Sequence, residues 1–158
     1  MVDAMHASLT KGWCSVLQRW IPVILWAGLI FYFSTENFSF SNTEGFFSAW
    51  LGWLLPGIAP ADLAQFHPLL RKGAHWVEYF ILAILLVRAR RSGNESELAM
   101  PTIAWTLALV LAYAVSDEYH QSWVPERIAS AVDVVIDTFG GICGVFWMCL
   151  SRKRSTGA

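Results

Sequence analysis

Charge is what this chain lacks most. Asp, Glu, Lys and Arg together make up 15% of its 158 residues, whereas hydrophobic residues make up 56%. A soluble domain usually has about 25% charged residues, so this chain has too little polar surface to cover itself in water. The three cysteines show no paired-ligand spacing, which argues against disulfides and against a cysteine metal site. A nucleic-acid-binding motif and a broad basic face are also missing, so we expect no nucleic-acid partner.

Long apolar runs stand in place of the missing charge. Each is a nearly continuous hydrophobic stretch of about 20 residues, the length that a helix needs to cross a bilayer. Polar and apolar residues do not alternate within these stretches. We therefore predict an all-α membrane protein with four transmembrane helices. Their expected bounds are Trp13–Phe33, Leu69–Val87, Met100–Val115 with a continuation into Ser116–His120, and Val132–Leu150.

The first apolar run has an alternative interpretation as a cleaved signal peptide. It ends in the bulky residues Phe31, Tyr32 and Phe33, and no small-residue cleavage pattern follows them. We therefore interpret it as an uncleaved helix. The expected organisation is a cytoplasmic N-terminal segment (residues 1–12), a four-helix membrane domain (residues 13–150) and a basic cytoplasmic tail (residues 151–158).

The connection formed by residues 34–68 contains a shorter apolar patch, Phe46–Leu55. This patch is too short to span a bilayer. Its two tryptophans, Trp50 and Trp53, and the Pro56-Gly57 pair that follows are typical of a helix in the headgroup layer. We predict a short interfacial helix in this first outer loop, and a re-entrant segment is the alternative.

Lys and Arg fall mainly on one side of the predicted bundle. Cytoplasmic loops carry an excess of these residues, which favours both termini in the cytoplasm and places the loops 34–68 and 116–131 outside. The inner set is Lys11, Arg19, Arg88, Arg90, Arg91, Arg152, Lys153 and Arg154, and the outer set is Arg71, Lys72 and Arg127.

Polar residues interrupt the apolar pattern near the outer ends of three helices. Within each helix they are three or four residues apart, so they share one helix face. A bundle would most simply point these faces at one another, which predicts one site built from three helices. Gly140 and Gly144 continue the last face and would let a neighbouring backbone approach closely. The three polar sets are His75, Glu78 and Tyr79; Asp117, His120 and Gln121; and Asp133 with Asp137.

Each polar residue also has a purely structural interpretation. His75 with Glu78 could form an intrahelical pair, and Asp133 could cap the fourth helix. Arg127 could neutralise the glutamate beside it or bind a lipid phosphate. Asp137 lies about a turn deeper, where a solitary ion is more costly. Taken together, the structural alternative is a buried ion network that fixes how the helices pack.

Three short motifs carry the most specific pattern: Phe33-Ser34; Arg71-Lys72-Gly73-Ala74-His75 with Glu78-Tyr79; and Ser116–Gln121 with Pro125, Arg127, Ser130, Asp133, Asp137 and Gly140. Together they resemble the signature of the VanZ-like family of integral membrane proteins, over roughly residues 20–150. The resemblance implies a multi-pass protein of the bacterial plasma membrane. The family is named for a protein that lowers sensitivity to the glycopeptide teicoplanin, so a role in antibiotic resistance is one expectation.

Carried over residue by residue, the family motif assigns a set of candidate site residues. We expect them to form a polar site at the outer membrane face. They are His75, Glu78, Asp117, Glu118, His120, Gln121, Arg127, Asp133 and Asp137.

Three functions compete for this site. The first is an enzyme acting on a lipid-linked or phosphate-bearing envelope substrate, with His75 or His120 as acid or base and Arg127 holding the anion. A divalent metal on the histidines and carboxylates is compatible with it, but the zinc-protease pattern His-Glu-x-x-His is absent, so we assign no cofactor. The second is a non-enzymatic protein that binds lipid, cell-wall material or a membrane partner. The third is proton-coupled transport, for which four helices would require a homo-oligomer.

Overall fold

The computed structural model of the protein describes residues 2–35, 45, 49–50, 52–54, 57, 66–91, 98–124 and 130–156, with side chains between residues 16 and 151 except that of His67. Four long helices make up most of this part of the chain. They are α1 (Val2–Phe33), α4 (His67–Arg90), α5 (Met100–Gln121) and α6 (Ala131–Thr156). The prediction of an all-α fold is therefore confirmed.

The helix ends follow local chemistry. Prolines open α4 and α5 in the first turn, where the missing N–H group would have no helical partner. The helix α5 continues to Gln121, as its polar last turn predicted. The helix α1 begins at Val2, well before the predicted start at Trp13, because residues 2–11 contain no proline or glycine and the single Gly12 that follows costs only about 1 kcal/mol.

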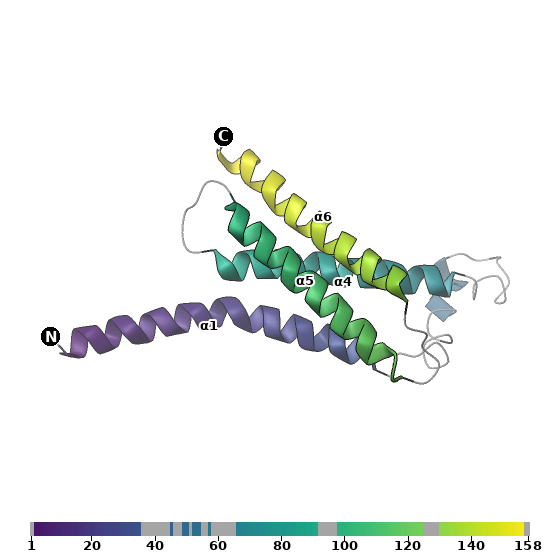
Figure 1. Cartoon of the computed structure of the whole chain (residues 1–158), viewed down its shortest axis with the longest axis horizontal. Helices are drawn as coiled ribbons and strands as arrows, with labels where there is room; N and C mark the ends of the chain where they lie inside the picture. Colours follow the sequence, from purple (N-terminus) through teal and green to yellow (C-terminus); the bar gives the residue numbers. More distant parts are fainter. Residues whose placement is uncertain are drawn as a thin grey trace.

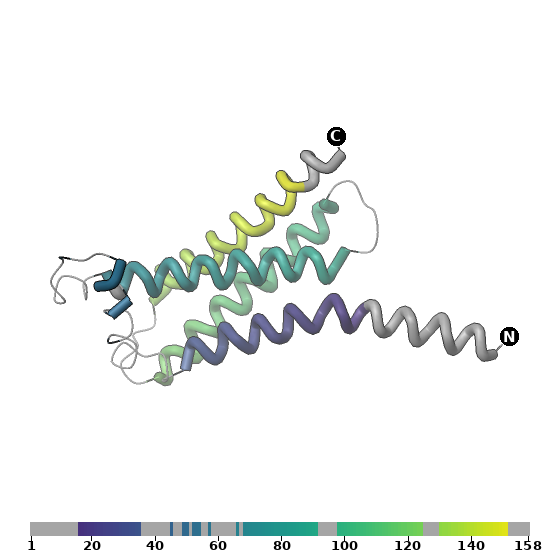
Figure 2. Tube along the Cα trace, turned by 180° about the vertical axis from the view of Figure 1, so that it is seen from behind, coloured from purple at the N-terminus to yellow at the C-terminus, as the bar shows by residue number. Residues whose placement is uncertain are grey.

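Successive helices run in opposite directions, and α4 lies at the centre of the bundle. It contacts each of the other three helices, and α6 most extensively. Figures 1 and 2 show α4 between α1 and α6. The helices α1 and α5 run parallel, because the Trp20 and Trp105 rings meet at one level and the Tyr113 hydroxyl donates to the carbonyl of Ala27 two turns further along.

Within the described part of the chain, three helices are long and apolar enough to cross a membrane: Val16–Phe33, Met100–Gln121 and Ala131–Ser151. The helix α4, also predicted to cross, does not reach that apolar composition, because charged residues stand near both of its ends and Glu78 lies within it. Its central position accounts for this difference. Neighbouring helices, and not lipid, surround much of its surface.

Two glycines allow the close packing of α4 and α6. A Cβ atom on Gly140 would fall on the carbonyl oxygen of Trp76, and one on Gly144 would fall on the carbonyl oxygen of Phe80. The two contacts lie one helical turn apart on each helix, so α4 and α6 run parallel and side by side. The predicted close approach at the small-residue pair is confirmed.

The interior and exterior of the bundle differ from those of a soluble protein. Large apolar side chains cover the outside, among them Ile24, Leu25 and Val135, each about two-thirds exposed. Such a surface is suited to lipid chains. The buried apolar core consists of Val23, Ile30, Tyr79, Leu82, Ala83, Leu86, Val87, Ala89, Val110, Ala114 and Val145.

Half of the predicted interfacial helix lies outside the described residues. Within the stretch 46–55, residues 49–50 and 52–54 are helical. The predicted helix Phe46–Leu55 therefore stays a prediction.

Candidate functional site

Gln121, at the end of α5, connects three helices through its side-chain amide. Its Nε2 atom donates to Asp117 Oδ2 at 2.9 Å and to Ser34 Oγ, just beyond α1, at 3.3 Å. Its Oε1 atom accepts a hydrogen bond from Arg71 Nη2 of α4 at 3.0 Å. Gln121 is only 1% exposed. The amide therefore fixes the Asp117 carboxylate and ties the ends of three helices together.

His75, Asp117 and Asp137 lie beside this amide, and each comes from a different helix. All three are buried, with Asp137 only 1% exposed. A ligand-type atom from each lies within 4.8 Å of the other two. The histidine Nδ1 is 3.7 Å from Asp137 Oδ1, which is longer than a hydrogen bond. The structure thus brings the predicted faces of α4, α5 and α6 together.

Glu78 faces the same histidine from within α4. Its Oε2 atom is 3.8 Å from His75 Nδ1, one helical turn away. The intrahelical pair that the sequence indicated is present. Glu78 is not the only carboxylate near His75, because that of Asp137 is about equally close to the same nitrogen atom.

The junction between α5 and α6 is held by Glu118 and Ser130. The Glu118 Oε1 atom accepts a hydrogen bond from the N–H of Ser130, the residue before α6. The Ser130 hydroxyl oxygen in turn accepts from the N–H of Val132 at 3.2 Å. Ser130 therefore caps α6, the role that the sequence offered to Asp133. The Asp133 carboxylate instead lies 3.9 Å from Lys72 Nζ of α4.

His120 lies apart from the buried trio, on the side of α5 that faces α1. Its ring is half-buried and packs on Phe31, with ring centroids 4.5 Å apart and planes tilted by 32°. It does not belong to the group of His75, Asp117 and Asp137 whose ligand atoms converge among the described residues.

Of the nine predicted site residues, seven gather at the end of the bundle where α5 ends and α6 begins, and His120 is adjacent to them. Arg127 lies outside the described residues. The sequence analysis did not place Ser34, Arg71 or Ser130 in the site, although all three make hydrogen bonds there. A spacing signal existed for Arg71, which is four residues before His75 and so shares its helix face.

The charges at this end are mostly negative. Among the described residues, two basic side chains, Arg71 and Lys72, accompany carboxylates that are buried or nearly so. An environment of this kind favours a proton or a metal cation, because uncompensated carboxylates are costly away from water. The carboxylates are those of Glu78, Asp117, Glu118, Asp133 and Asp137.

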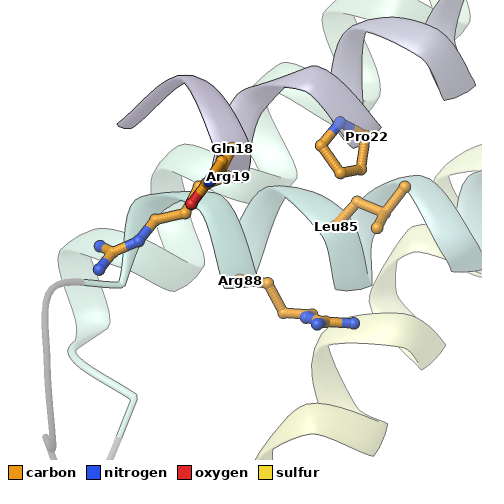
Figure 3. A pocket seen from close by; sticks show the side chains of 5 residues that line it. All are labelled: Gln18, Arg19, Pro22, Leu85 and Arg88. Atoms are coloured by element: carbon orange, nitrogen blue, oxygen red, sulfur yellow. The ribbon is translucent and has the colours of Figure 1, made fainter. Parts of the chain in front are cut away.

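The opposite end of the bundle is basic and has a different form. A pocket of about 250 Å³ lies there between α1 and α4. In Figure 3 the guanidinium groups of Arg19 and Arg88 extend in different directions and do not converge on one point. Arg19 Nη1 donates to the carbonyl of Arg91 at 2.7 Å. The pocket is lined by Gln18, Arg19, Pro22, Leu85 and Arg88.

Comparison with known proteins agrees with the motif pattern. No curated protein and no solved structure matches the chain. The VanZ/LLP1 family model matches residues 19–152, which include α4, α5, nearly all of α6 and the apolar part of α1. With apolar helices around a shared polar end, and a family match across most of its length, this chain is a membrane protein that belongs to the VanZ/LLP1 family.

Proposed function

We propose that this protein resides in the bacterial plasma membrane and binds a phosphate-bearing, lipid-linked molecule of the cell envelope at the polar end of its bundle. The observation that carries the proposal is the burial of His75, Asp117 and Asp137, from three helices, at one end of an otherwise apolar bundle. Buried ionisable groups in membrane helices are costly, and they usually mark a ligand or ion site.

The rim of the site provides groups for an anionic ligand. Lys72 is accessible there, with 44% of its side chain exposed, and Arg71 lies beside it in α4. An arginine and a lysine together can hold a phosphate by hydrogen bonds and charge. Tyr119 and Trp123 are strongly exposed at the same end, as aromatic residues at a membrane interface commonly are. A lipid could therefore reach this rim from within its own leaflet.

The proposed orientation places the polar end outside and both termini in the cytoplasm. Arg19, Arg88 and Arg91 lie together at the opposite end, and Arg90 packs over the ring of Trp105 there, 4.6 Å from its centroid. A basic end facing the cytoplasm agrees with the positive-inside tendency. In this arrangement α4 is the fourth crossing, since its 24 residues measure about 36 Å.

Cysteine labelling tests the orientation. In a chain whose three native cysteines are replaced by alanine, Ser122→Cys should react with an impermeant thiol reagent in intact cells. Ser151→Cys, at the other end of the bundle, should react only after the cells are opened. Both serines are exposed in the structure, so accessibility within the protein is matched. The reverse labelling pattern would overturn the outward site.

Ligand binding is tested by replacing basic residues with glutamine at the polar end and at the basic end of the bundle. Protein purified gently from its native membrane is analysed by mass spectrometry for co-purifying phosphorus-containing lipids. Arg71→Gln and Lys72→Gln should each remove the bound lipid, whereas Arg88→Gln should retain it. Loss in all three variants, or in none, contradicts binding at the polar end. In a deletion strain, Arg88→Gln should restore the wild-type lipid and cell-wall profile, whereas Arg71→Gln and Lys72→Gln should not. The family resemblance adds teicoplanin sensitivity as a further measurement.

An enzymatic form of this proposal adds one requirement. His75, between the carboxylates of Glu78 and Asp137, would accept or donate a proton during turnover of the bound lipid. The expected result is that His75→Gln retains the lipid but abolishes its conversion. If the lipid and cell-wall profiles of His75→Gln matched those of the wild type, the protein would bind the lipid without converting it.

The connection made by Gln121 favours a second candidate, a structural network without a ligand. In that case, Asp117→Asn and Asp137→Asn would lower thermal stability while leaving the cellular phenotype intact. The ligand proposal predicts loss of phenotype even in variants whose unfolding midpoint is unchanged.

A further inference from the structure

We infer that His75, Asp117 and Asp137, which meet from α4, α5 and α6 in the buried polar end, bind a divalent transition-metal ion, Zn²⁺ or Mn²⁺. Imidazole nitrogen favours zinc and its neighbours in the transition series, and carboxylate oxygen suits manganese and zinc. One histidine and two aspartates therefore form a donor set that both ions accept.

The spacing of the three groups is close to what a metal requires. Their ligand atoms lie within 4.8 Å of one another. Three ligands at about 2.1 Å from one tetrahedral ion stand about 3.4 Å apart. The largest separation must therefore shorten by about 1.4 Å, a distance that side-chain rotation can supply. A three-helix origin also means that the bound ion would connect α4, α5 and α6.

Asp137 provides an independent observation. Its Oδ1 atom is fully buried and makes no hydrogen bond among the described residues. Among the described residues, the basic side chain within ion-pair distance of it is His75, at 3.7 Å. Lys72 pairs with Asp133, and Arg71 bonds to Gln121. A buried carboxylate oxygen without a hydrogen bond is costly, and a metal ion beside the histidine would satisfy it.

The surroundings hold one of the ligands in place. Gln121 donates to Asp117 Oδ2 at 2.9 Å, and Arg71 and Ser34 fix Gln121 in turn. Metal ligands are typically oriented by such hydrogen bonds, and removing an outer partner weakens metal affinity about 10- to 100-fold. The Asp117 carboxylate is therefore positioned before an ion arrives.

The metal would also resolve an electrostatic conflict in the ligand proposal. A phosphate is repelled by the carboxylates of the site, whereas an ion with three protein ligands keeps a coordination position open for an oxygen atom. This link to the phosphate rests on the proposed function. Metal binding itself rests only on His75, Asp117 and Asp137.

The test uses the full chain, purified in detergent with an affinity tag that contains no histidine. Protein stripped with chelator is titrated with Zn²⁺, Mn²⁺ or Mg²⁺ alone, and bound metal is measured by elemental mass spectrometry. We expect one Zn²⁺ or Mn²⁺ per chain and a rise in the unfolding midpoint. Cobalt in place of zinc should give visible absorption bands typical of a nitrogen- and oxygen-coordinated ion.

The same substitution at two histidines, His75→Gln and His120→Gln, gives a matched control. His75→Gln and Asp137→Asn should weaken metal binding more than about 100-fold, which exceeds the effect expected for Gln121→Ala, the loss of an outer partner. His120→Gln, which changes the histidine packed on Phe31, should bind as the wild type does. Helix content by circular dichroism identifies any variant that fails to fold. If a variant fails to fold, the metal stoichiometry and the cobalt spectrum of the wild-type protein decide whether the site exists.

Two results would overturn the inference: wild-type protein that binds no more metal than a blank, or equal loss of metal in His75→Gln and His120→Gln. Metal binding without any co-purifying phosphorus-containing lipid would contradict the proposed ligand while leaving the metal site intact. Lipid binding that persists in chelator would remove the metal from that interaction.

Discussion

The two halves of α4 have different buried neighbours, although the outer surface of the bundle is similar around both. Its first half brings His75 and Glu78 to a buried polar cluster, whereas its second half buries Leu82, Leu86 and Val87 among apolar neighbours. Large apolar side chains cover the outside at both levels. The two levels therefore differ in their interior and not in their lipid-facing surface.

The two halves are also held together differently. At the polar end, hydrogen bonds through Gln121 join three helices. Further along α4, beside Phe80, contact with α6 depends on backbone approach at Gly144. Lipid chains are as apolar as leucine, so association in a membrane depends on close packing and hydrogen bonds more than on hydrophobic burial. Substitutions in each half can measure the two contributions separately.

The largest effect is expected where backbone meets backbone. In Gly144→Ala the new Cβ atom falls on the carbonyl oxygen of Phe80, and helix backbone cannot rotate away as a side chain can. We expect the free energy of unfolding to fall by about 3 kcal/mol, at the upper end for overpacked sites. Dodecyl sulfate-induced unfolding, followed by circular dichroism, measures the change.

Gly28→Ala in α1 is the control for this prediction. A Cβ atom at Gly28 meets nothing within 4 Å, and alanine favours a helix over glycine by about 1 kcal/mol. This variant should be as stable as the wild type or more so. Equal destabilisation of both variants would show that close packing between α4 and α6 is not what the glycine provides.

At the polar end, Gln121→Leu should have the next largest effect. The substitution keeps a side chain of similar size but leaves Arg71 and Asp117 without their shared amide partner. Buried polar groups that lose a partner destabilise a protein by about 2 kcal/mol. The same unfolding measurement applies. Gln18→Leu, on the exposed surface of α1, should change stability by less than about 0.5 kcal/mol.

The sequence predicted the helices well because hydrophobic run length and proline position are local properties. The continuation of α5 through its polar last turn and the glycine contact between α4 and α6 followed from spacing alone. The start of α1 was misplaced, since hydropathy marks where a chain enters a membrane and not where a helix begins.

That polar residues of α4, α5 and α6 share one end of the bundle was predictable, but the contacts among them were not. Helical periodicity placed His75, Asp117 and Asp137 on inward faces, yet it could not say that Asp137 rather than His120 lies beside His75. That choice depends on how α4, α5 and α6 rotate against one another. The cap of α6 is Ser130, where Asp133 had been one of two interpretations, and Glu118 also reaches the N–H of Ser130 from α5.

A smaller effect is expected at the contact between α1 and α5. The Tyr113 hydroxyl donates to the carbonyl of Ala27 at 2.6 Å, so Tyr113→Phe removes one hydrogen bond and little else. The expected loss of stability is about 1 kcal/mol. Tyr119→Phe changes an exposed tyrosine of the same helix and should be neutral. Equal effects would mean that the hydroxyl of Tyr113 contributes nothing to helix association.

The smallest effect should come from the basic end, and it tests whether the two ends differ in stability as well as in composition. Arg19 donates to a backbone carbonyl at 2.7 Å, much as Arg71 donates to Gln121 at 3.0 Å, but the Arg19 contact is exposed and the other is partly buried. Water can replace an exposed hydrogen bond, so Arg19→Gln should change the free energy of unfolding by less than about 0.5 kcal/mol. Arg71→Gln should exceed that value in the same unfolding experiment, because its amide partner cannot turn to water. If Arg19→Gln destabilised the protein as much as Arg71→Gln, burial would not be what separates the two ends.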